Sequence, residues 1–167
     1  GQGGYSDVIS PATSEPLAPG DVLMLDTGAV RDGYFCDFDR NYSVGPASAA
    51  VRAAHDHLID ATEAAFDLAR PGARISDLFH AMDRVLTGGS GGSDAGRLGH
   101  GLGMQLTEGV SAIPADHTVL VPGMVLTLEP GFDLSEGRMM VHEENIVITE
   151  EGARYLSDPA GRTLVQV

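Results

Sequence analysis

Residues 26–45 read DTGAVRDGYFCDFDRNYSVG, and this stretch carries two carboxylates, Asp26 and Asp37, eleven residues apart. The segment RDG at 31–33 is typical of a hairpin turn in which Gly33 adopts a positive φ. The flanking segments are strand-like and apolar, so we expect an antiparallel pair that brings the two carboxylates together. Two buried anions at close range repel, and they need a shared proton or a cation between them.

Three residues further along the chain are able to complete a cation site. They are His100 in GHGLG, Glu129 in LTLEPGF and Glu143 in HEENIVIT. Together with the two aspartates they form a hard, oxygen-rich ligand set, which suits Mn, Co, Zn or Fe bound as a pair.

Composition excludes several classes of function. The chain has 167 residues, 43% hydrophobic and 20% charged, as expected of one soluble globular domain. A net charge of -14 argues against nucleic acid or an anionic membrane as a partner. No apolar run is long enough to span a membrane, and no signal peptide is visible. The single cysteine, Cys36, excludes an internal disulfide and favours a reducing cytoplasm.

Hydrophobic patterning predicts strands first and then helices. The apolar run 22–26 is consistent with a strand buried on both faces, and 34–44 is its partner. Alternation places Tyr34, Cys36 and Phe38 on the face that packs in the core. An apolar stripe from Val51 to Leu68 predicts a helix over 47–70. The stripe consists of Val51, Ala54, Leu58, Ala61, Ala65 and Leu68.

The second half of the chain adds a shorter helix and more strands. Ser76 is expected to cap a helix that ends near Leu86. In the first helix His55 and His57 are expected at the surface, and in the second His80 is expected to be structural or exposed. Residues 87–96 read TGGSGGSDAG, which predicts a flexible loop, native or engineered. Strands are expected at 98–106 and in a last hairpin of 124–132 with 138–149, which gives an α+β class.

The ligand set and its local contexts resemble the pita-bread metallopeptidases. This family includes methionine aminopeptidase, Xaa-Pro aminopeptidases, Xaa-Pro dipeptidases and the non-peptidase creatinase. The resemblance covers about residues 17–153 and includes the GY-x-x-D-x-x-R pattern, present from Gly33 to Arg40. It implies a curved antiparallel sheet covered by helices. Residues 1–167 would be a C-terminal catalytic domain that lacks its first elements and a separate N-terminal domain, and we expect a homodimer.

The resemblance also implies the role of each residue. Asp26 would chelate one metal, Asp37 and Glu143 would bridge two, and His100 and Glu129 would complete the coordination of the second metal. Two divalent ions, manganese first, would activate a water molecule. Catalytic roles fall on Glu129, as the proton carrier, on His100 and on Thr107. Glu144 is the rival to Glu143, which stands six residues before Thr149 as the family's glutamate does.

Three positions depart from the Xaa-Pro pattern. Thr107 replaces a second histidine, Val141 replaces an arginine, and Gly96 replaces a further histidine.

The first hypothesis is a hydrolase that uses two metal ions to cleave the amide bond of a small Xaa-Pro peptide. The second is a non-peptidase hydrolase of small C–N substrates, of creatinase or ectoine-hydrolase type. The third is a non-catalytic pita-bread module that binds a partner protein.

Overall fold

The computed structural model describes residues 1–7, 12–92, 96–134 and 137–167. Across these residues the chain forms two helices and three sheets. The helices are α1 (Ala49–Leu68) and α2 (Ile75–Thr87). One sheet has the order β1-β2-β10, with β1 (Val22–Arg31), β2 (Tyr34–Ser43) and β10 (Val165–Gln166).

The second sheet has the order β4-β3-β5-β8-β9. Its strands are β3 (His100–Gly101), β4 (Glu108–Ser111), β5 (Val125–Leu128), β8 (Glu144–Ile148) and β9 (Ala153–Tyr155). The third is a pair of short strands, β6 (Gly131–Asp133) and β7 (Met139–Val141). The predicted α+β class is confirmed, because the helices are grouped at 49–87 and the sheets are built of antiparallel pairs apart from the parallel contact of β10 with β2.

The predicted hairpin forms around a two-residue turn. Asp32 and Gly33 both have positive φ, 52° and 87°, as the favoured hairpin turns require. In the resulting register Asp26 stands opposite Asp39, and Gly28 stands opposite Asp37. Residues that face each other in an antiparallel ladder share one side of the sheet. The three aspartates therefore project from the same face of the hairpin.

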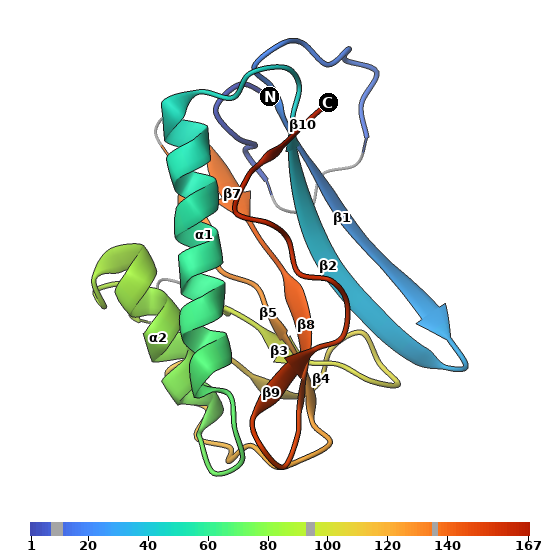
Figure 1. The fold of residues 1–167 in the computed structure, drawn as a ribbon, viewed down its shortest axis with the longest axis vertical. Coiled ribbons are helices and arrows are strands. Elements are labelled where there is room, and N and C mark those ends of the chain that lie inside the picture. Colours follow the sequence, from blue (N-terminus) through green and yellow to red (C-terminus); the bar gives the residue numbers. More distant parts are fainter. Residues whose placement is uncertain (8–11, 93–95, 135–136) are drawn as a thin grey trace.

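Two expectations about the burial of this hairpin were wrong. The run 22–26 is not buried on both faces, because Leu25 is 46% exposed and Asp26 is also exposed. Tyr34, expected in the core, is 61% exposed. The reason is tertiary: β2 is the one strand that pairs with β1 in the described residues, and the hairpin extends away from the helices (Figure 1).

The first predicted helix is confirmed, with small differences at its ends. Ser48 caps α1 by accepting a hydrogen bond from the N–H of Val51. The predicted apolar stripe is buried up to Ala65, but Leu68 is 39% exposed at the last residue of the helix. His55 was expected at the surface and is instead buried, with Nε2 3.0 Å from the carbonyl oxygen of Gly161. The C-terminal segment covers this histidine, and no local pattern encodes that contact.

The cap of the second helix lies two residues before the predicted cap. The N-cap is Arg74, whose N–H donates to the carboxylate of Asp77 at 3.0 Å. Ser76, the expected cap, is buried inside the first turn and lies 3.2 Å from Nδ1 of His117. Gly88, at φ 71°, ends the helix, so Thr87 belongs to α2 rather than to the predicted loop. Residues 93–95 of that loop lie outside the described residues.

The hydrophobic core lies between the two helices and the five-stranded sheet. The helices pack on each other, and Figure 1 shows them side by side along the same side of the strands. Fully buried side chains from both layers meet there; they include Leu58, Phe79, Met82, Leu126 and Ile146. This core holds β5 and β8 rigidly, and these strands border the candidate site.

The predicted last hairpin is divided into two strand pairs. The expected strand 124–132 breaks between β5 and β6 at Glu129-Pro130, and 138–149 breaks between β7 and β8 at His142-Glu143. Pro130 has no N–H to donate to a ladder, which accounts for the first break. Both breaks carry a glutamate of the predicted ligand set. Glu129 and Glu143 therefore project from the irregular junctions between strands and not from the strands themselves. Residues 135–136 of the predicted turn lie outside the described residues.

The predicted strand 98–106 was also wrong in extent. Only His100–Gly101 is a strand. A loop follows it and ends where β4 starts at Glu108. The ladder shifts its register between these two residues of β3. The strands β4, β9 and β10 were not predicted, because each is short, and β10 also depends on pairing with β2, far along the chain.

Candidate metal centre

His100 is held by its backbone and by one ring nitrogen. Its N–H donates to the hydroxyl of Thr127 at 3.1 Å, and its Nδ1 lies 3.0 Å from the carbonyl oxygen of Gly101. Because a carbonyl only accepts, Nδ1 carries the proton and Nε2 keeps a free lone pair. The side chain is 2% exposed. Nε2 is therefore oriented to act as a ligand.

Three carboxylates surround that nitrogen. Nε2 lies 3.9 Å from Oδ2 of Asp37, 3.7 Å from Oε2 of Glu129 and 4.0 Å from Oε1 of Glu143. Ligand atoms about 2.1 Å from one shared ion lie no more than about 4.2 Å apart. Ligand atoms of Asp37, His100 and Glu143 all lie within 4.8 Å of one another. The spacing therefore fits a cation among these side chains.

The carboxylates of the cluster outnumber the basic side chains beside them, since within the residues described Arg97 pairs with Glu129 alone. Burial, reinforced by Glu129 and Asp37, raises the pKa of Glu143 to about 10. Its Oε1 has no hydrogen-bond partner among the described residues. Burial, then the charge of Asp26, also raises the pKa of Asp37. A divalent cation would remove this cost by neutralising several carboxylates at once.

Asn145 positions Asp37 and was missed by sequence reasoning. The N–H of Asp37 donates to Oδ1 of Asn145 at 3.1 Å, and Nδ2 of Asn145 donates to the carbonyl oxygen of Asp37. Asn145 lies in β8, so these bonds join the hairpin to the five-stranded sheet. A polar amide inside the apolar run ENIVI was the available signal.

Arg97 was also missed. Its Nε donates to Oε1 of Glu129 at 3.2 Å, and its charge offsets a small part of the rise in the pKa of Asp37. Arg97 is about 40% exposed at the mouth of the cluster, and Glu129 is 20% exposed. The remaining carboxylate oxygen of Glu129 faces His100. Arg97 thus fixes the orientation of the least buried of the three carboxylates around the imidazole.

Glu144, the rival of Glu143, belongs to a different network. Its carboxylate accepts from Nη2 of Arg40 at 2.9 Å and from the N–H of Ala160 at 2.7 Å, and it lies 3.2 Å from Nε2 of His142. Burial favours the neutral acid, but the bonds from His142 and Ala160 and the charge of Arg40 outweigh it and lower the pKa of Glu144. The structure thus directs Glu143, and not Glu144, toward His100.

Two of the predicted site residues lie at the edge of this arrangement or outside it. Asp26 is exposed on β1, close enough for its charge to raise the pKa of Asp37. Thr107 is exposed in the loop between β3 and β4 and is not part of the cluster. Four of the five predicted metal ligands, Asp37, His100, Glu129 and Glu143, therefore lie together. The fifth, Asp26, lies on the neighbouring strand of the hairpin.

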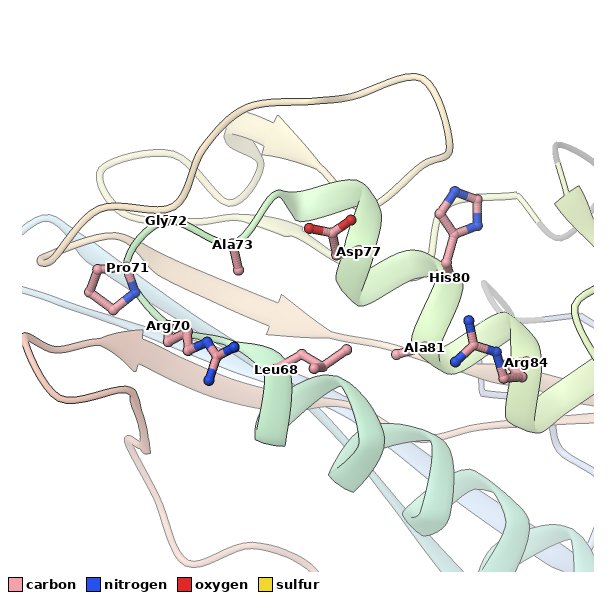
Figure 2. A pocket seen from close by; sticks show the side chains of 9 residues that line it. All are labelled: Leu68, Arg70, Pro71, Gly72, Ala73, Asp77, His80, Ala81 and Arg84. Carbon is pink, nitrogen blue, oxygen red and sulfur yellow. The ribbon is translucent and has the colours of Figure 1, made fainter.

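A separate hollow of about 760 Å³ lies where α1 leads into α2 (Figure 2). Arg70, Asp77, His80 and Arg84 are among the side chains around it. His80 is exposed there, as expected. None of the candidate ligands lines this hollow, so it is distinct from the carboxylate cluster.

The fold and the cluster together define a metallopeptidase-like centre on a pita-bread scaffold. Residues 3–150 match Metallopeptidase family M24, and the chain belongs to that family. The Xaa-Pro dipeptidase of Pyrococcus furiosus is 31% identical over 147 residues, which are 87% of this chain and 42% of that protein. The chain thus spans less than half the length of this relative.

Solved structures confirm the predicted fold. Dipeptidase PepE from Mycobacterium ulcerans superposes with a TM-score of 0.87 at 29% identity, over 97% of this chain and 44% of that one. The X-Pro aminopeptidase from Thermotoga maritima gives a TM-score of 0.84 at 28% identity, over 93% and 44%. Among the described residues, neither helix is long and apolar enough to cross a membrane.

Proposed function

We propose that this chain carries the metal centre of a cytoplasmic peptidase that hydrolyses the amide bond of small Xaa-Pro peptides. The observation that carries the proposal is the convergence of Asp37, Glu129 and Glu143 on Nε2 of His100. Membership of the metallopeptidase family and similarity to an Xaa-Pro dipeptidase support the choice of reaction and substrate.

Two divalent cations would occupy the centre, with manganese the first choice and cobalt, zinc or iron as alternatives. Asp26 and Asp37 would hold one ion, and His100 and Glu129 the other, with Asp37 and Glu143 shared between them. The unpartnered Oε1 of Glu143 and the oxygen-rich donor set fit hard cations of this kind. When bound, such ions polarise the substrate carbonyl and acidify water.

The side chains of the chain supply orientation and proton transfer. Glu129 would accept a proton from the attacking water and return it to the leaving amine. Its position supports this role, because it is partly exposed, faces His100 and is held on its other oxygen by Arg97. Thr107 would offer its hydroxyl as a hydrogen-bond donor to substrate. A hydroxyl does not supply the positive charge that a histidine would bring.

Thr107 and Val141 favour a second candidate, a hydrolase of small C–N compounds of creatinase or ectoine-hydrolase type. Neither side chain supplies the cationic contact that the Xaa-Pro pattern expects at its position. Turnover of a cyclic amidine or a guanidino compound, with no turnover of Xaa-Pro dipeptides, would establish this candidate instead. A partner-binding module remains the third hypothesis, and its partner binding would survive complete chelation of metal.

The test compares metal content with hydrolysis in one set of variants. We expect about two manganese ions per chain and cleavage of Xaa-Pro dipeptides, both lost in Asp37→Ala. Asp32→Asn is the matched control, because Asp32 lies in the exposed hairpin turn and Asn also tolerates its positive φ. Retained manganese-dependent hydrolysis in a folded Asp37→Ala protein would refute the proposed centre. Size-exclusion chromatography with light scattering tests the predicted homodimer.

A further inference from the structure

Asp39 is a buried carboxylate that the five-residue ligand set does not include. It lies on β2 and is only 3% exposed. Its Oδ1 has no hydrogen-bond partner among the residues that the structure describes. A buried acid without a partner is costly, so its surroundings must either keep it protonated or offer it a cation.

The ladder directs Asp39 toward the metal centre. It stands opposite Asp26 in the register and two residues from Asp37, so all three share one face of the hairpin. Side chains in opposed positions of an antiparallel pair have Cβ atoms about 4.5–5.5 Å apart.

The neighbouring arginine does not neutralise this acid. The guanidinium of Arg40 donates to the main-chain oxygens of Asp39 and Glu143 and to the carboxylate of Glu144. It also donates to the carbonyl oxygen of Asp158. These contacts engage both terminal nitrogens of Arg40, and no ion pair joins Arg40 to the Asp39 carboxylate in the described part of the chain.

We propose that Asp39 is an additional metal ligand, shared with Asp26 and Asp37 around one cation. This inference rests on the proposed metal centre and extends it to a sixth residue. A third carboxylate makes that ion's environment harder and more negative, which favours manganese over softer cations. The sequence alone offered no reason to separate Asp39 from an ordinary polar residue of a strand.

The test is a titration of metal-free protein with Mn²⁺ at constant pH and ionic strength. In Asp39→Asn we expect one of two binding events to weaken by about 10–100-fold, the range found when groups that support a metal site are removed. Asn has the shape of a protonated aspartic acid, so an acid that stays neutral would be replaced without effect. Asp32→Asn, in the exposed turn, is the control and should bind as the wild type does.

Absorption of the Co²⁺-loaded protein gives a second readout that does not depend on activity. Asp39→Asn should change the visible bands if Asp39 coordinates the ion, and Asp32→Asn should leave them unchanged. Unaltered Mn²⁺ affinities and an unaltered Co²⁺ spectrum would overturn the proposal. If Asp39→Asn does not fold, Asp39→Thr enters the same titration with the same criteria. Failure of the wild type to bind metal would instead refute the proposed function.

Discussion

Asn145 connects the two parts of the molecule that build the candidate site. Its amide exchanges two hydrogen bonds with the backbone of Asp37, although 108 residues separate the two positions. Asp37 is otherwise carried on a hairpin whose first strand is largely exposed. The placement of a candidate ligand therefore depends on a residue that contacts no ion itself.

Asn145→Ala should destabilise the protein and weaken metal binding together. It leaves the N–H and the carbonyl of Asp37 without their partners, which costs about 1–3 kcal/mol of unfolding free energy. Urea denaturation and Mn²⁺ titration measure the two effects. Gln105→Ala, in an exposed loop, removes an amide with little effect on either. Unchanged metal affinity in Asn145→Ala would show that Asp37 is held by other contacts.

The metal-free protein should lose stability as the pH rises. Burial raises the pKa of Glu143 to about 10 and that of Asp39 to about 7, so the folded state binds more protons than the unfolded state above pH 4.5. Stability falls with pH wherever the folded state binds the extra protons. Urea denaturation in a chelator should therefore give a lower unfolding free energy at pH 8 than at pH 5.5.

Asp39→Asn provides the control for this pH dependence. An amide does not titrate, so this variant should show a smaller loss of stability between pH 5.5 and pH 8 than the wild type. Saturating Mn²⁺ should also reduce the loss, because the cation replaces the protons that the acids share. A metal-free wild type that gains stability over the same interval would contradict the sign of both shifts.

At the scale of elements, the two glycines beside His100 allow backbones to approach closely. Gly99 has φ 149°, and a Cβ there would lie 2.3 Å from the carbonyl oxygen of Thr127. At Gly101 it would lie 2.3 Å from the carbonyl oxygen of Glu108. The motif GHGLG thus places an imidazole between β4 and β5 where larger residues would separate the strands.

Gly99→Ala should therefore destabilise the protein more than Gly109→Ala does. Both glycines have positive φ, but a Cβ at Gly109 meets no atom within 4 Å. Gly109→Ala should cost about 1–2 kcal/mol from backbone strain alone. Gly99→Ala adds about 1–3 kcal/mol from the clash and should also weaken Mn²⁺ binding by displacing His100. Equal losses in thermal denaturation would show that the strands move apart easily.

At the scale of the whole molecule, the C-terminal segment 156–162 contacts both α1 and β8, the strand that follows Glu143. Its main chain bonds to Asn145, to the carboxylate of Glu144 and to the ring of His55. Arg162 pairs with Asp60, at 2.6 Å, and with Glu63 on α1. The segment therefore links the helical layer to the side of β8 that faces away from the candidate ligands.

Glu144 and Arg162, at the two ends of this link, should contribute differently to the free energy of unfolding. Glu144→Gln should cost about 3 kcal/mol, because it removes the charge from a buried pair with Arg40. Arg162→Ala should have a much smaller effect, since its pairs with Asp60 and Glu63 are about half exposed and screened by solvent. Urea denaturation of the two variants checks the order, and a larger loss in Arg162→Ala would reverse this interpretation.

The sequence by itself determined the family, the hairpin turn and the two helices, and it supplied the candidate ligand set. These features depend on local signals: RDG at 31–33, an apolar stripe in α1, and candidate ligands that each stand in a short motif. A turn or an amphipathic helix is encoded within about a dozen residues, so a single chain read in order is sufficient.

Only the tertiary structure decided which polar side chains meet. It placed Asp39, Arg97 and Asn145 at the cluster, directed Glu143 rather than Glu144 toward His100, and buried His55 under the C-terminal segment. It also divided the last hairpin at its two glutamates. These outcomes depend on contacts between segments up to 108 residues apart, and no local pattern specifies such contacts because either partner alone is compatible with many surroundings.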